Sequence, residues 1–305
     1  MAFTAKDVQA LREMTGVGMM DCKKALAATD GDMDAAVAYL RERGLAAAAK
    51  KAGRIASEGI VYANVYDSGV GVIVEVNSET DFVAKNDEFR TFVESVAGVI
   101  AEGNPATVEQ LSELKYPDFD LTVADVLREK VLVIGENIRI RRFERFDSGV
   151  SVAYVHMGGK IGVLVNMDVS DNIKDNAEVK ELGKDVAMQI AAMRPRYLNR
   201  NEVDAETLEE EKRILMAQTL QEGKPQAVAE KIVAGRMNKF YEENCLVDQA
   251  FVKDNKTSVQ KHIDAVAKEL GGSITITRFV RFEKGEGLEK KTDNLADEVA
   301  KMVGK

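Results

Sequence analysis

The sequence predicts an α+β protein, in which helices pack against antiparallel sheets. Three observations support this class. Runs rich in β-branched residues alternate with segments of helical period. Sequence motifs after residue 60 recur at fixed offsets, which indicates an internal duplication. The 305 residues, 45% hydrophobic and 30% charged, are enough for two or three domains with real cores.

Composition excludes several classes of function. A net charge of −9 argues against binding to a phosphate backbone as the main activity, so no direct nucleic-acid partner is expected. No apolar run approaches the roughly 18 residues of a membrane span. Cys22 and Cys245 lie too far apart for a metal motif and are typical of reduced thiols in a cytoplasmic protein. With two histidines in the chain, neither a metal site nor a cofactor is predicted.

The first element is a three-helix unit with its connector, residues 1–55. Thr4 and Asp7 form a capping-box-like start, and the third helix is predicted to begin near residue 32 and to stop at Gly44. Residues 45–54 are alanine-rich and basic, which predicts a helical or semi-flexible connector. A unit this small has a thin core, so Met19 and Met20 suit a docking surface; alternatively, both fill that core.

The next elements form a duplicated core. Motifs of the first repeat, residues 56–146, recur 90 residues later, and those near its end recur 136 residues later. The second repeat therefore occupies residues 147–195 and 245–285, with about 46 extra residues inserted after Pro195. Each repeat is predicted to contain two strands, a long helix, a variable connection, another helix and a strand. The matched pairs include Ala63/Ala153, Glu88/Glu178, Val96/Val186, Pro105/Pro195, Gly135/Gly271 and Phe143/Phe279.

The insertion, residues 196–244, is predicted to be an antiparallel helical hairpin. Helical segments at 203–221 and 226–241 flank a turn at Gly223-Lys224-Pro225. Their apolar stripes are narrow, so the hairpin serves either as an interaction arm or as structural decoration. Residues 286–305 are predicted to form a C-terminal helical module.

The pair Asp81-Phe82 is the strongest candidate for a contact site. It follows a strand-like run at 70–76 and precedes a helical pattern, so it lies at a strand-to-helix corner. A carboxylate and a large apolar ring that project together suit a wedge inserted into a partner. The alternative is local: Thr80 or Asp81 caps a helical turn, and Phe82 or Val83 packs it onto the core.

Signatures of catalysis are scarce. Gly158-Gly159-Lys160 lacks the spacing and hydroxyl of a phosphate loop, and Gly69-Val70-Gly71 lacks the third glycine of a dinucleotide fingerprint. His156 ends a predicted strand beside the turn at Gly158-Gly159, where a partner can reach it. An enzyme with a carboxylate-lined cleft between the repeats stays open, although no motif supports it.

Several motifs together resemble the bacterial elongation factor Ts family. Residues 11–26, which contain Thr15-Gly16-Val17-Gly18-Met19-Met20, are similar to its N-terminal signature. Residues 76–85, which contain Thr80-Asp81-Phe82-Val83, are similar to its second signature. The remaining similar segments are 134–138, 223–225, 235–237 and 281–290, so the resemblance spans nearly the whole chain.

The resemblance implies a guanine-nucleotide exchange factor, not an enzyme, that acts on elongation factor Tu. It further implies a ubiquitin-associated-like N-terminal domain and a hairpin that contacts a partner or forms a weak homodimer. Thr80, Asp81, Phe82 and Val83 would approach the partner's magnesium site as the exchange wedge. The implied partner-binding residues are Arg12, Met19, Met20, Lys23, Ile134, Gly135 and His156. The alternative function is a noncatalytic adaptor that tethers the GTPase.

Overall fold

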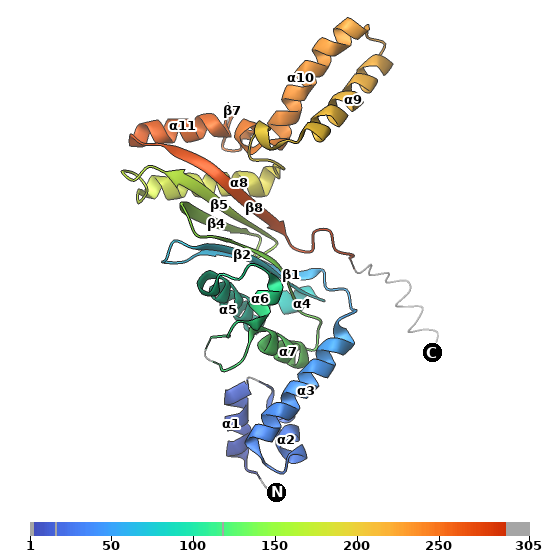
Figure 1. Ribbon diagram of the computed structural model, residues 1–305, viewed down its shortest axis with the longest axis vertical. Coiled ribbons are helices and arrows are strands. Elements are labelled where there is room, and N and C mark those ends of the chain that lie inside the picture. Colours follow the sequence, from blue (N-terminus) through green and yellow to red (C-terminus); the bar gives the residue numbers. More distant parts are fainter. Residues whose placement is uncertain (1–2, 16, 118, 291–305) are drawn as a thin grey trace.

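The computed structural model describes residues 3–15, 17–117 and 119–290 of the chain. Its elements follow one another in layers along the longest axis of the molecule (Figure 1). A small helical unit occupies one end, two layers of sheet with covering helices lie in the middle, and a helical hairpin projects at the other end. This mixture of helices and small antiparallel sheets confirms the predicted α+β class.

The N-terminal unit consists of α1 (Ala5–Thr15), α2 (Met19–Ala28) and α3 (Met33–Lys51). The predicted stop of the third helix at Gly44 is wrong, because α3 continues through the alanine-rich segment to Lys51. Gly44 is buried, and a Cβ at this position would lie 3.6 Å from the Arg128 carbonyl oxygen. Gly44 therefore lies where α3 contacts α7, at a distance that would also accommodate a Cβ in ordinary van der Waals contact.

The first sheet and its helices come from one stretch of chain. Strands β1 (Glu58–Val65), β2 (Gly71–Ser78) and β3 (Arg139–Phe146) pair antiparallel in that order. Between β2 and β3 lie α4 (Asp81–Ala84), α5 (Asp87–Gly103), α6 (Val108–Glu113) and α7 (Val123–Ile134). Phe89, Phe92, Val93 and Val96 of α5 are buried, as their helical spacing predicts.

A second set of elements repeats this order. Strands β4 (Val150–His156), β5 (Ile161–Val169) and β8 (Ile274–Glu283) form the second antiparallel sheet. The helices α8 (Ala177–Met193) and α11 (Val259–Leu270) have the lengths of α5 and α7 and lie 90 and 136 residues after them. Even the helix ends correspond: Thr122 and Ser258 cap α7 and α11, and Gly135 and Gly271 terminate them with positive φ.

The hairpin is formed by α9 (Ala205–Gln221) and α10 (Gln226–Asn244), which lie antiparallel (Figure 1). Smaller elements at its base are η1 (Arg200–Glu202), η2 (Leu246–Asp248), β6 (Ala250–Phe251) and β7 (Asp254–Ser258). The hairpin has its own small apolar cluster, which comprises Val203, Val233, Met237, Phe240 and Cys245.

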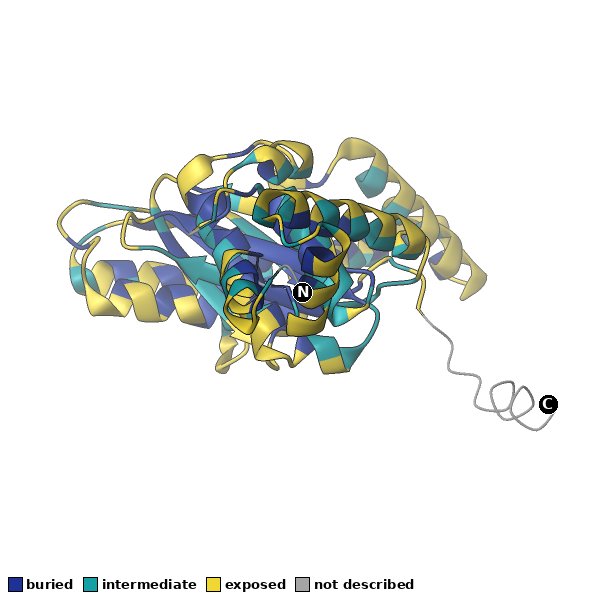
Figure 2. Cartoon of the chain, turned by 90° about the horizontal axis from the view of Figure 1, so that it is seen from below, coloured by how far each residue is buried: buried dark blue, intermediate teal, exposed yellow. Residues whose placement is uncertain are grey.

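The two three-stranded sheets pack directly against each other. Val61, Ile73 and Phe146 of the first sheet meet Leu164 and Phe282 of the second. Gly71 and Gly162 permit this approach, because a Cβ on either residue would collide with side chains of the facing sheet. The outer faces are covered by α5 on one side and α8 on the other, so the buried residues gather at the centre (Figure 2).

Residues 284–288 continue from β8 as turns and a bend. The helix predicted for the C-terminal module falls largely on residues 291–305, which lie outside the described residues. Within the described ranges, no helix has both the length and the apolar character needed to cross a membrane. Over the same ranges, no cluster of three metal-ligating side chains is found.

Candidate functional site

The corner between β2 and α5 presents Phe82 to solvent. Phe82 is 80% exposed on the four-residue helix α4. The Thr80 hydroxyl caps this helix by accepting from the Val83 amide at 3.4 Å. Val83, rather than Phe82, packs onto the first core. The local interpretation is thus correct for Thr80 and Val83, whereas Phe82 makes no such contact and stays exposed.

Asp81 accompanies the ring as an ionised group. Its carboxylate lies 2.6 Å from the Lys85 ammonium nitrogen, one helical turn away. The hydrogen bond from Lys85 lowers the pKa of Asp81 below its usual value. The Lys85 nitrogen also lies 6.0 Å from the centre of the Phe82 ring. Both partners are substantially exposed, so this pair can exchange for other contacts at low cost.

Glu136 holds the start of α4 in place. Its carboxylate accepts from the Glu79 and Thr80 amides at 3.0 Å each and from the Thr80 hydroxyl at 2.6 Å. Gly135 turns the chain here with φ of 86°, which a glycine adopts without strain. Ile134 is half-buried against the first core. The structure therefore brings Ile134 and Gly135 to the Thr80 corner.

Sequence reasoning missed Glu136, although it lies inside the quoted segment 134–138. Its role depends on contacts with residues 56 and 57 positions earlier, which no local pattern reveals. The available signal was an acidic residue directly after a helix-ending glycine, where it can accept from exposed backbone amides.

His156 lies at the end of β4 and is exposed. Its Nδ1 is 2.8 Å from the Tyr154 hydroxyl. The following turn contains Met157, 68% exposed and with φ of 49°, and Gly158 and Gly159, both also with positive φ. The Gly159 carbonyl accepts from the Val61 amide at 2.8 Å, so this turn is attached to the first sheet. A polar ring and an apolar side chain are thereby presented together.

The remaining predicted residues lie on the N-terminal unit, apart from the corner. Met19 and Met20 are 45% and 62% exposed at the start of α2, so they do not fill the core. Arg12 and Lys23 are also exposed, on α1 and α2. Among the described residues, no hydrogen bond or ion pair joins these four to α4. They constitute a second candidate surface with two cations and two flexible apolar side chains.

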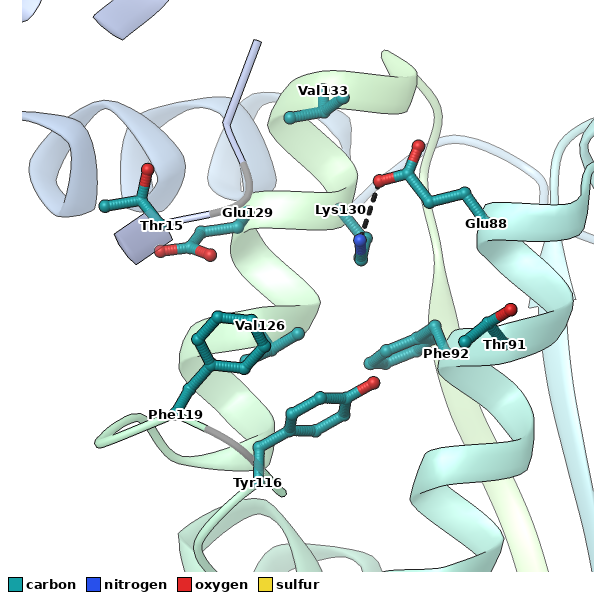
Figure 3. Close-up of a pocket in the computed structure, with 10 residues that line it drawn as sticks. All are labelled: Thr15, Glu88, Thr91, Phe92, Tyr116, Phe119, Val126, Glu129, Lys130 and Val133. Carbon is teal, nitrogen blue, oxygen red and sulfur yellow. Dashed lines mark hydrogen bonds and ion pairs between the residues drawn. The ribbon is translucent and has the colours of Figure 1, made fainter. Parts of the chain in front are cut away.

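A cavity of about 250 Å³ lies between α5, α7 and the segment around Tyr116, close to Thr15 (Figure 3). None of the predicted site residues lines it. Burial raises the pKa of Glu129, one of its lining residues, to about 7. Lys130, the next residue of α7, forms an ion pair at 2.7 Å with Glu88 of α5. Because Thr15 ends α1 and Glu129 lies on α7, this cavity borders the junction of the N-terminal unit and the first core.

The arrangement favours contact with a macromolecule over bond-making chemistry. The α4 corner projects a ring and a carboxylate from a backbone that hydrogen bonds fix in position. The only strongly shifted acid described above, Glu129, lies elsewhere and is buried. An exposed ring with an adjacent anion can fill an apolar recess while it displaces or competes with other anionic ligands.

Comparisons with known proteins agree with the resemblance of the motifs. A family model described as "Elongation factor TS" matches residues 79–286. An elongation factor Ts of Clostridium perfringens is 54% identical over 305 residues, covering 99% of each chain. One from Trichlorobacter lovleyi is 52% identical over 310 residues and covers 100% of this chain and 99% of its own. One from Clostridium kluyveri is 50% identical over 98% of each chain.

Proposed function

The chain belongs to the elongation factor Ts family, and from this premise we propose that it releases GDP from elongation factor Tu so that GTP can bind. Membership gives the chain a role in translation elongation, as an exchange factor and not as an enzyme that makes or breaks covalent bonds. The observation that carries the proposal is Phe82, 80% exposed on a helix that Thr80 caps and Glu136 anchors.

The proposed mechanism uses the α4 corner as the exchange element. Phe82 enters an apolar recess beside the partner's magnesium site, and Asp81 brings a negative charge close to the magnesium and phosphate groups. The charge repels phosphate or competes for the metal. Thr80 fixes the angle at which the helix meets the partner, and Val83 anchors it to the core.

The binding free energy needed to release the nucleotide requires more than one contact with the partner. Each tenfold loss of nucleotide affinity needs about 1.4 kcal/mol of binding that favours the nucleotide-free partner. Burying a phenylalanine side chain supplies about 1.5–3 kcal/mol. Phe82 alone therefore accounts for a factor of about 10–100, and a larger effect needs further contacts that are formed only with the loosened partner.

We assign the affinity to a separate surface. Met19 and Met20, flanked by Arg12 and Lys23, form an exposed patch that is adaptable in shape and positively charged. This patch docks on the GTPase, and the N-terminal unit acts as a ubiquitin-associated-like domain. Ile134, Gly135 and the His156 turn complete the contact near the exchange element.

We propose the following division of the chain into domains. Residues 1–55 form the docking domain with its connector, and the recurrence of elements supports two repeats at 56–146 and at 147–195 with 245–285. Residues 196–244 form an inserted arm, and residues 286–305 form a C-terminal module. The arm contacts a partner or a second copy weakly.

The remaining parts of the proposal concern the cellular location of the protein and the ligands that it does not bind. The protein works in the cytoplasm, without a cofactor and without direct contacts to nucleic acid or membrane. The net charge of −9 supports the absence of a nucleic-acid partner.

The alternative is an adaptor that binds the GTPase without accelerating release. The test uses elongation factor Tu loaded with a fluorescent GDP analogue, excess unlabelled GDP and this protein at one-tenth of the GTPase concentration. Exchange predicts complete, fast release, because each copy acts many times. If GDP is released no faster than in the absence of this protein, while binding to the GTPase is still measurable, the adaptor function is supported instead.

A further inference from the structure

We propose that Arg90 is a positioning residue that joins the Phe82 helix to the His156 turn, so that both meet the partner as one rigid surface. The inference rests on the proposed function and extends it to a residue without a contact role of its own. Arg90 is half-buried in the first turn of α5.

The guanidinium of Arg90 reaches both segments at once. Its Nε donates to the Ala84 carbonyl, the last residue of α4, at 3.2 Å. Its Nη2 donates to the Gly158 carbonyl, in the turn after His156, at 3.1 Å. Gly158 is 68 residues from Arg90 in the sequence and follows a strand of the other sheet. One side chain thus links the two candidate contact segments.

Each of these segments needs an external tie. A helix of four residues cannot hold its own shape, since all of its carbonyl groups are terminal. Glu136 and Thr80 fix its beginning, and Arg90 satisfies a carbonyl at its end. In the turn, Met157, Gly158 and Gly159 all have positive φ, which is unfavourable for a methionine. Outside contacts keep such a turn in a single conformation.

The chemistry of arginine suits this role better than that of lysine. Its guanidinium presents several N–H donors in a fixed planar fork, whereas an ammonium is a single point on a flexible stem. Within the described ranges, no carboxylate pairs with Arg90, so its hydrogen bonds to backbone carbonyls define its contacts. The expected contribution is therefore geometric, and retaining the positive charge alone should not replace it.

The test measures GDP release from elongation factor Tu as a function of factor concentration, for wild type, Arg90→Ala and Arg90→Lys. We expect the maximum rate to fall about fivefold or more in both variants, the size of one to two lost hydrogen bonds. The concentration for half-maximal rate should change less than twofold, because the N-terminal patch is intact.

Arg145→Ala is the control for the loss of an arginine on the same core, and it also removes an ion pair with Asp147 at 2.7 Å. Arg145 also donates through Nε to a helix-terminal carbonyl, that of Ala101 at 3.1 Å, but at the opposite end of α5. This variant should keep the wild-type maximum rate. Equal loss in the Arg90 and Arg145 variants would show a general stability effect and overturn the proposal.

A second measurement does not depend on nucleotide exchange. Amide hydrogen exchange of the free protein should show that Arg90→Ala weakens protection at residues 81–86 and at 157–160 together, with the far-ultraviolet circular dichroism unchanged. Loss at neither segment, or at one only, would contradict the link. If the wild-type protein fails to accelerate GDP release from elongation factor Tu while Arg90→Ala still weakens amide protection at both segments, the proposed function fails and the structural link stands.

Combining Arg90→Ala with Phe82→Ala completes the test. Because Arg90 acts in part through the position of Phe82, its effect on the maximum rate should be smaller in the Phe82→Ala background, with the part that acts through the His156 turn retained. Fully additive losses would overturn the positioning role.

Discussion

Phe82 and Glu129 occupy surroundings opposite to those that their chemistry prefers. An apolar ring is 80% exposed, and a carboxyl group is 7% exposed beside a cavity. In the proposed function, a partner buries the exposed ring. The buried acid has a cost that depends on pH, since burial in apolar surroundings favours the neutral form and raises the pKa of Glu129 to about 7.

Glu129 yields a prediction about stability. The folded protein binds this proton more tightly than the unfolded chain, whose carboxyl has a pKa near 4.5. Tighter binding of the Glu129 proton stabilises the folded state. This contribution to the free energy of unfolding is complete below pH 4.5 and is lost as the pH rises through about 7. Glu129→Gln should be more stable than wild type by roughly 2–3 kcal/mol at pH 8, with little difference at pH 4.5. Urea unfolding at both pH values measures this difference.

Glu113→Gln, the same chemical change at an exposed position of α6, is the control and should show no such pH dependence. A Glu129→Gln difference that is equal at the two pH values would contradict the account.

How far residues can be predicted from sequence depends on the range of their contacts. Thr80, Asp81 and Phe82 could be proposed from the sequence because a local motif and a strand-to-helix corner coincide. Glu136 and Arg90 were missed because their hydrogen bonds cross 56 and 68 residues of chain. Sequence patterns report neighbours along the chain, whereas these two act on neighbours in space.

At the scale of elements, helices and repeats were predictable where periodicity and capping agree. The hairpin came from the difference between two repeat offsets, and its helices lie where the apolar stripes indicated. The end of α3 was not predictable, because Gly44 has the appearance of a helix terminator. In the structure Gly44 lies inside α3, at the contact with α7, and local propensity does not reveal such a tertiary contact.

The hairpin yields a prediction about self-association. Its exposed large apolar residues within the described ranges are three, Ile214, Leu220 and Val228. A stable dimer generally buries about 1,200–2,000 Å². We therefore expect monomers at low micromolar concentration in sedimentation experiments, with weak association only at far higher concentration.

The double variant Leu220→Glu, Val228→Glu should abolish this weak association, while Met19→Glu on the N-terminal unit should leave it unchanged. A stable dimer at micromolar concentration that survives the double substitution would contradict an association through the hairpin.

At the scale of the whole molecule, the proposed function assigns docking and exchange to different layers. The exposed methionines of α2 and the exposed ring of α4 lie on different units, which contact each other through α3 and α7. A partner that spans both would be held by the first and disturbed by the second. We therefore expect affinity and exchange rate to respond to different substitutions.

The most direct measurement of this division is the rate of GDP release from elongation factor Tu, followed to saturation with wild type, Phe82→Ala and the Met19→Ala, Met20→Ala double variant. The Phe82→Ala plateau should fall about tenfold or more, while its half-saturating concentration changes little. The methionine variant should need more protein for half-saturation but reach the wild-type plateau. A Phe82→Ala variant that reaches the wild-type plateau would contradict the account.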